Sequence, residues 1–216
     1  MSRSGTETRT PVRDGETGAC KMKHPSNREL FTYWNKQRGT RLAPDRAEID
    51  PAAIRKVLGD TFILDADSAA SPFRLAGTRL CALFGRELKG QGFVNLWERS
   101  GQTAMRELLA VVTEEKAGVV ASVSAAVAED AVLAVNMELL LLPLSFESKT
   151  DARVLGGLAP MAAPYWLGAK SVGLLRLGMF RHIGPAVDTL SPPRLVAPSG
   201  RATRHGLTVY EGGRPD

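Results

Sequence analysis

The chain has 216 residues, 44% of them hydrophobic and 24% charged, which allows one globular domain with appendages. Two cysteines exclude a disulfide framework, and the lack of a signal-peptide pattern or of a membrane-length apolar run predicts a soluble, cytoplasmic protein. The net charge of +5 comes from residues 1–28 and 192–216, because residues 29–191 hold 18 basic and 18 acidic side chains, and this neutral middle argues against a nucleic-acid-binding domain.

The first predicted element is a helix that follows the polar residues 1–24, which we expect to be disordered. In "SNRELFTYWNKQRG", Ser26 and Glu29 form an S-x-x-E pattern that predicts a capping box, and Gly39 has the place of a C-terminal cap. One apolar stripe is expected on this helix, made of Leu30, Phe31, Tyr33 and Trp34.

Shorter elements come next. A second helix is predicted from Asp50, as its N-cap, to Gly59, as its end. Strands at 61–65 and 73–76, joined by a turn-rich connection, predict a hairpin. The segment "TRLCALFG" then predicts a short helix capped by Thr78 and ended by Gly85. The buried side chains of the two short helices are expected to be Ile54, Val57, Leu58, Leu80, Leu83 and Phe84.

The second half of the chain alternates apolar residues at strand spacing after one longer helix. The helix is predicted over 100–116, with Gly118 ending it and with Met105, Leu108, Leu109 and Val112 on its buried face. Three strands are expected, at 119–127, 132–142 and 153–161. The residues that follow are apolar enough to pack on the domain, as a strand or as a helix.

The order of these elements predicts an α+β fold with an antiparallel sheet, because no regular strand–helix–strand crossover is present. Two strands, a helical segment and three strands is the order of a PAS domain. The segments "YWNKQRGTRLAPDRAEIDP", "FILD", "FRLAGTRLCALFGRELKG" and "FVNLW" resemble the stand-alone single-PAS proteins of alphaproteobacteria. This resemblance covers roughly residues 28–165, and it implies a five-stranded antiparallel sheet with helices across one face.

The resemblance also implies a function: a cytoplasmic sensory or regulatory protein of bacterial signal transduction that is not an enzyme. Its core is expected to sense a ligand or to dock another protein. We expect a disordered basic segment at 1–24, flanking helices at 25–59, the PAS core at 60–165, an extension packed on the core at 166–191 and a disordered tail at 192–216.

Glycines and arginines alternate in "FRLAGTRLCALFGRELKG", but the segment contains neither G-x-G-x-x-G nor G-x-x-x-x-G-K-[ST]. We therefore interpret it as a strand-to-helix corner and not as a phosphate loop. Arg74, Arg79 and Arg86 leave two interpretations open. They are exposed and pair with Glu87 or Asp65, or they clamp a small anionic substrate of an enzyme or binding protein. The second interpretation requires them to converge on one pocket.

No cofactor is predicted. Haem is disfavoured because His24, His182 and His205 lie outside the expected core. Flavin is disfavoured because Cys81 lacks the cysteine motif of light-sensing PAS domains, and we expect it to be a buried, inert thiol. The sequence has no G-x-S-x-G elbow and no metal-binding spacing, so neither a catalytic nor a metal site is predicted.

The candidate residues for a ligand pocket or an interface are mostly aromatic or basic. The aromatic stripe of the first helix packs on its own domain or docks a partner. The tryptophan in "FVNLW" is expected at the mouth of the PAS cavity, which it lines or plugs. The candidates are Tyr33, Trp34, Arg38, Arg74, Arg79, Arg86, Trp97 and Met137.

Two kinds of partner are expected: a small-molecule ligand, and a protein partner or second copy that binds through the N-terminal helix and the outer face of the sheet. Nucleic acid is not expected. A further alternative has the basic ends of the chain binding nucleic acid or anionic lipid around an inert core.

Overall fold

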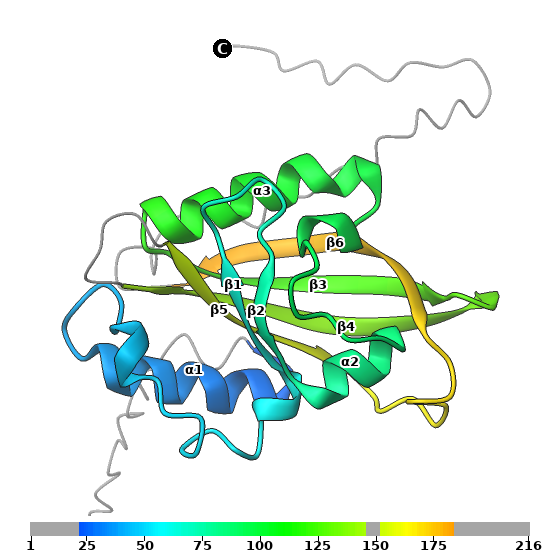
Figure 1. Ribbon diagram of the computed structural model, residues 1–216, viewed down its shortest axis with the longest axis horizontal. Helices are drawn as coiled ribbons and strands as arrows, with labels where there is room; N and C mark the ends of the chain where they lie inside the picture. The colour runs from blue at the N-terminus through cyan, green and yellow to red at the C-terminus, as the bar shows by residue number, and fades with distance from the viewer. Residues whose placement is uncertain (1–21, 146–151, 184–216) are drawn as a thin grey trace, which may run out of the picture.

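The protein is described by a computed structural model over residues 22–145 and 152–183 (Figure 1). The predicted tail at 192–216, Cys20 and His205 lie outside these residues. Within them, six strands form one antiparallel sheet in the order β2-β1-β5-β4-β3-β6. The helices and strands are α1 Pro25–Arg38, β1 Thr61–Asp65, β2 Phe73–Ala76, α2 Thr78–Phe84, α3 Arg99–Glu114, β3 Gly118–Val127, β4 Asp130–Leu144, β5 Arg153–Pro160 and β6 Val172–Ile183.

The predicted α+β class and hairpin are confirmed. β1 and β2 pair antiparallel, with Ile63 opposite Leu75. β1 also pairs with β5, where Ile63 lies opposite Leu155. The strand that comes first in the sequence is therefore an interior strand of the sheet, which explains why its first four residues are all buried.

The sheet has one strand more than the five predicted. The apolar residues after the fifth predicted strand, for which the sequence did not decide between strand and helix, form β6. This strand pairs with β3 and is an edge of the sheet. Its side chains alternate as a half-covered strand requires, since Leu175 is fully buried while Leu174 and Arg176 on either side are exposed.

One face of the sheet, here called the inner face, is covered by α2 and α3. The predicted stripe of α3 is confirmed, because Met105, Leu108, Leu109 and Val112 are all buried there. At the centre of this layer, aromatic rings contact one another with centroids 5.4–5.7 Å apart and exclude water. The rings belong to Phe62, Phe73, Phe93 and Trp97.

The opposite face, the outer face, carries α1 across β4 and β5. Leu30 and Trp34 of α1 are each 1% exposed, in one cluster with Leu140 and Leu155 of the sheet. The indole N–H of Trp34 donates to the carbonyl of Pro143 at 2.8 Å, so the buried ring also satisfies its polar atom.

The predicted capping box at the start of α1 is wrong. His24 is the N-cap, and its Nδ1 accepts a hydrogen bond from the Ser26 amide at 3.2 Å. The hydroxyl of Ser26 instead donates to a buried carboxylate, which is a stronger acceptor than a backbone group. A capping box does occur in "DRAE", where Asp45 and Glu48 cap a single 3-10 turn.

Three other predicted helix ends differ in detail. Asp50 caps as expected, but the residues after it form turns with hydrogen bonds between residues three apart, so no α-helix forms there. Thr78 is the first residue of α2 and Gly77 its N-cap, which makes no side-chain cap bond. After α3, the positive φ lies at Lys116, while Gly118 begins β3.

Candidate functional site

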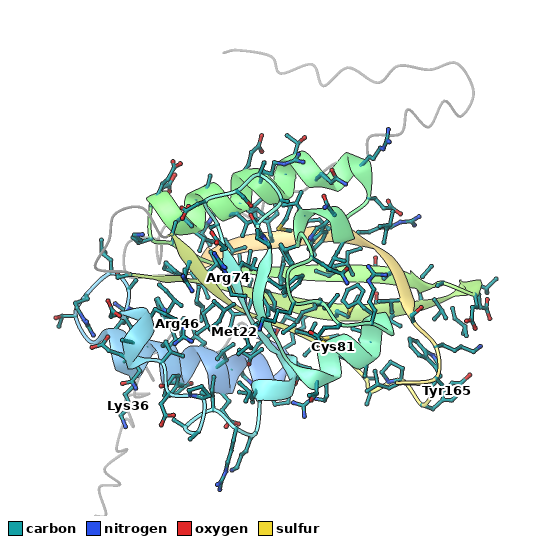
Figure 2. All side chains as sticks on the ribbon, in the orientation of Figure 1. Met22, Lys36, Arg46, Arg74, Cys81 and Tyr165 are labelled. Atoms are coloured by element: carbon teal, nitrogen blue, oxygen red, sulfur yellow. The ribbon has the colours of Figure 1, made fainter. Side chains whose placement is uncertain are left out.

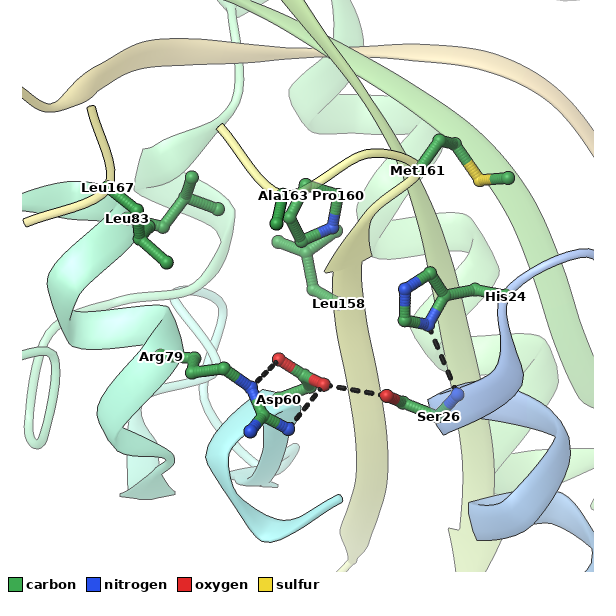
Figure 3. Close-up of a pocket in the computed structure, with 10 residues that line it drawn as sticks. All are labelled: His24, Ser26, Asp60, Arg79, Leu83, Leu158, Pro160, Met161, Ala163 and Leu167. Atoms are coloured by element: carbon green, nitrogen blue, oxygen red, sulfur yellow. Dashed lines mark hydrogen bonds and ion pairs between the residues drawn. The ribbon is translucent and has the colours of Figure 1, made fainter. Parts of the chain in front are cut away.

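A pocket with a volume of about 310 Å³ lies among α2, the end of β5 and the loop that follows β5 (Figure 3). Leu83 and Leu158 belong to the inner core, so the floor of the pocket is the core itself. This volume is at the lower end of the range for small-molecule sites. The apolar lining consists of Leu83, Leu158, Pro160, Met161, Ala163 and Leu167.

The loop that covers the pocket, residues 161–171, carries apolar side chains on its outside as well. Tyr165 is 90% exposed and points away from the sheet (Figure 2), while the next residue, Trp166, is buried in the inner core. The buried ring of Trp166 thus anchors the loop to the core, while Ala163 and Leu167 line the pocket.

Asp60 is the centre of the polar wall. It is 5% exposed, and both its oxygens are engaged: Arg79 Nε and Nη2 each donate at 2.7 Å, and the Ser26 hydroxyl donates at 2.8 Å. The hydrogen bonds that Arg79 donates to Asp60 raise the pKa of Arg79 above its usual range. Arg79 and Asp60 thus form a two-point ion pair in the pocket wall, so each matches the charge of the other.

His24 joins this wall to the sheet. Its backbone amide donates at 2.9 Å to Glu138, a residue of β4 that is 5% exposed beneath the N-terminus of α1. The same carboxylate accepts from the Lys23 amide at 2.7 Å and from Asn27 Nδ2 at 3.2 Å. A continuous series of contacts thus runs from β4 through the first turn of α1 to Asp60.

Two glycines allow these close approaches. At Gly77, a Cβ atom would overlap the backbone carbonyl oxygens of Leu58 and Gly59, so α2 begins directly against the turn that carries Asp60. At Gly157 of β5, a Cβ atom would overlap Oδ1 of Asn27. Side chains at either position would push α2 or α1 away from the pocket wall.

A family profile described as "PAS domain" matches residues 22–159, which is more than half of the chain. The chain belongs to the PAS domain family. Membership supports a sensory or regulatory role in general. The narrower resemblance, to stand-alone alphaproteobacterial proteins, stays a prediction.

Among solved structures, the PAS domain is similar to one titled "Structure of an RNA-binding Light-Oxygen-Voltage Receptor", with 16% identity and a TM-score of 0.40. The match covers 56% of this chain and 36% of that receptor chain. No curated protein matches the chain.

The structure does not bring the three candidate arginines of this PAS domain together. Arg79 lines the pocket, paired with Asp60. Arg74 pairs with Asp65 at the other end of β1, as one of the two interpretations expected, and Arg86 donates to Gln91 at 3.0 Å.

Trp97 and Met137, which the sequence placed among the candidates, lie in the inner core and are 0% and 2% exposed. Trp97 contacts the ring of Phe93 edge-on, so it fills the space between sheet and helices. Its indole N–H is buried and has no hydrogen-bond partner within residues 22–145 and 152–183.

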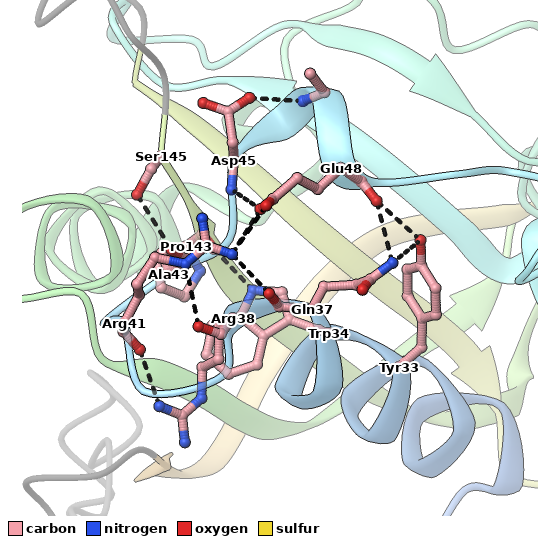
Figure 4. Close-up of polar contacts among 11 residues, drawn as sticks. Tyr33, Trp34, Gln37, Arg38, Arg41, Ala43, Asp45, Glu48, Pro143 and Ser145 are labelled. Atoms are coloured by element: carbon pink, nitrogen blue, oxygen red, sulfur yellow. Dashed lines mark hydrogen bonds and ion pairs between the residues drawn. The ribbon is translucent and has the colours of Figure 1, made fainter.

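The remaining candidates lie on α1, next to the segment that follows it (Figure 4). The guanidinium of Arg38 lies 5.4 Å from the centroid of the Trp34 ring and donates to Asn35 and to the Arg41 carbonyl. The Tyr33 hydroxyl accepts from the Asp50 amide at 2.8 Å. These contacts hold the segment 41–50 against α1.

Beside them, the exposed carboxylate of Glu48 has a pKa below its usual 4.5, because Arg41 and then the Asp45 amide donate to it. A lowered acid pKa means that the stabilisation is present above 4.5 and is lost as the pH falls through the folded pKa. Arg41→Met should therefore be less stable than the native protein at neutral pH, measured by urea unfolding. The difference should shrink in acid to the part that comes from the hydrogen bonds of Arg41 to the carbonyls of Gln37 and Arg38. Arg55→Met, at an exposed arginine that forms no ion pair within residues 22–145 and 152–183, should show no such dependence on pH.

The sequence missed His24, Ser26 and Asp60 as site residues.

Cys81, expected to be buried, is only half-buried, and its Sγ lies 3.6 Å from Glu87 Oε1. His182 lies on β6. Within the described ranges, no cluster of three or more His, Cys, Asp or Glu side chains is arranged to hold a metal ion, and no helix there is long and apolar enough to cross a membrane.

Proposed function

We propose that this PAS domain is a cytoplasmic regulatory module of bacterial signalling that acts by binding and not by catalysis. A small molecule in the pocket changes how α1 docks on the sheet, and a partner protein or second copy reads α1 and the neighbouring outer face. The observation that carries the proposal is the hydrogen bond between Ser26 Oγ and Asp60, because it makes the first turn of α1 part of the pocket wall.

The coupling follows from the contacts on either side of that bond. A ligand that shifts Arg79 or Asp60 alters the partner of Ser26, and the Ser26 amide is held by the N-cap His24. The backbone of His24 is in turn fixed to Glu138. A change at the pocket therefore acts on the residues that set where α1 begins, and a population shift between docked and loosened α1 is the expected signal.

Exposed apolar side chains on β6, an edge strand of the sheet, support a protein partner. Leu174 and Met179 of β6 are 54% and 57% exposed. Rings fill the inner core, so a planar cofactor there would have to displace buried side chains such as Phe93 and Trp97. The enzyme alternative loses support because only Arg79 of the three arginines lines the pocket, and its charge is matched by Asp60.

The test is a thermal-shift screen of small molecules on the full chain, followed by hydrogen exchange of the hits. Compounds that raise the melting temperature should also slow amide exchange in residues 22–38. Ser26→Ala should weaken that link, because it removes the hydroxyl that reaches Asp60.

Thr32→Ala is the matched control, since its exposed hydroxyl on the same helix donates to the backbone carbonyl of Arg28 and does not reach the pocket wall. Turnover of a bound compound, abolished by a single side-chain change inside residues 60–161, would refute the proposal. So would hits that leave exchange in α1 unchanged.

A further inference from the structure

The chemistry of the pocket's polar wall selects a ligand class. Asp60 and Arg79 neutralise each other, and the other ionisable lining residue is His24. Because Nδ1 of His24 accepts from the Ser26 amide, the donor N–H of the ring is at Nε2. The lining therefore presents no net charge to a ligand.

A charged ligand would have no unmatched counter-charge in this wall. Moving a carboxylate or an ammonium from water into a pocket with six apolar lining residues costs far more than moving a neutral group. To bind an ion, the pocket would have to open the pair of Asp60 and Arg79, which is made of two hydrogen bonds of 2.7 Å. The ion pair of Asp60 and Arg79 thus disfavours the binding of both cationic and anionic ligands.

Asp60 and His24, the two residues that contact Ser26 in the pocket wall, each have a polar atom that can form a further hydrogen bond. Oδ1 of Asp60 accepts one hydrogen bond, from Arg79, and a carboxylate oxygen has room for a second. Nε2 of His24 has no partner in the part of the chain that the structure describes. In Figure 3 the Asp60 carboxylate lies beside the Ser26 hydroxyl and the His24 ring lies above it, and all three line the pocket together with Leu158 and Pro160. One acceptor and one donor therefore face the same apolar space.

We infer that the pocket binds a neutral, mainly apolar small molecule that carries one hydroxyl or comparable donor–acceptor group. The hydroxyl donates to Asp60 Oδ1 and accepts from His24 Nε2, while the apolar body lies against Leu83, Leu158 and Leu167. The volume of about 310 Å³ holds about ten non-hydrogen atoms, at the ~30 Å³ that a water molecule takes in the liquid. This inference rests on the proposed function and names the ligand class for it.

The experiment compares four probes on one skeleton: 2-phenylethanol, ethylbenzene, phenylacetate and 2-phenylethylamine. Binding to the full chain is measured by calorimetry or by ligand-observed NMR. The alcohol should bind about tenfold tighter than ethylbenzene, from two added hydrogen bonds, and tighter still than either ion.

Two pairs of variants locate the binding. Ala163→Phe should abolish it by filling the pocket, whereas Ala162→Phe should not, since both alanines are exposed on the same loop and only Ala163 lines the pocket. His24→Asn keeps a good N-cap but removes the ring donor, so it should weaken the alcohol several-fold and leave ethylbenzene unchanged.

The possible results separate the ligand class from the site. If phenylacetate or 2-phenylethylamine binds tightest and Ala163→Phe abolishes that binding, the ligand class is wrong and the pocket remains a binding site. If the probes bind equally well to Ala163→Phe, the site is wrong, and the proposed function fails with it. If none of the four binds up to its solubility, this inference is overturned, and hydrogen exchange with screening hits decides the proposed function.

Discussion

Gly77→Ala should lower the free energy of unfolding by about 3 kcal/mol, the upper part of the range for forcing extra atoms into a packed site. The added Cβ would overlap the carbonyl oxygens of Leu58 and Gly59, which are backbone atoms and have no rotamer to escape to. The overlap between the new methyl group and these oxygens is relieved only if α2 moves away from the turn that holds Asp60. Urea unfolding of the full chain measures the loss.

Gly101→Ala is the matched control. It lies in the first turns of α3, where a Cβ atom would meet nothing within 4 Å. Alanine there should raise stability by about 0.5 kcal/mol, because the unfolded chain loses more freedom than the helix does. If the two variants shifted stability in the same direction, the close approach at Gly77 would not determine where α2 sits. Hydrogen exchange of Gly77→Ala should also show faster exchange around Arg79.

Local sequence signals predicted most elements of this fold. β1 and β2 begin and end as the hairpin pattern predicted, because an apolar run bounded by turn residues has few alternatives. The apolar spacing in α3 determined its buried face for the same reason. The secondary structure of β6 could not be predicted from the sequence, because "SVGLLRLGMF" is a short apolar run that fits a strand or a helix. Only its pairing with β3 decides between the two.

The pocket was not predictable from local patterns, because its polar residues meet only in the folded chain. Ser26 and Asp60 are 34 positions apart, and His24 and Glu138 are 114 apart. Ser26 followed by Glu29 fits a capping box in isolation, yet the buried carboxylate of Asp60 takes the hydroxyl. One signal was present: Asp60 directly precedes an apolar strand, where an acidic residue must find a partner if it is buried.

The contacts of Glu138 with the start of α1 also join residues far apart in the sequence, and removing them should strongly lower stability. Glu138→Gln should lower the free energy of unfolding by about 2 kcal/mol, since hydrogen bonds to a charged group contribute more than neutral ones. The native carboxylate accepts from two backbone amides, of Lys23 and His24, and from the side chain of Asn27. Glutamine has one acceptor oxygen, and its own NH₂ group would face one of these N–H donors.

The loss should be local, because Glu138 lies beneath the N-terminus of α1 and the other strands keep their pairing. Amide exchange should speed up over residues 22–38 and stay unchanged in α3. Glu107→Gln, at an exposed position of α3, removes the same charge without a buried contact and should change stability by less than about 0.5 kcal/mol. Faster exchange over the whole chain, or none in α1, would mean that Glu138 does not hold α1 to the sheet. If exchange becomes faster over the whole chain, the Glu138 carboxylate stabilises the domain as a unit. A ligand at Asp60 could then not loosen α1 separately from the rest of the domain.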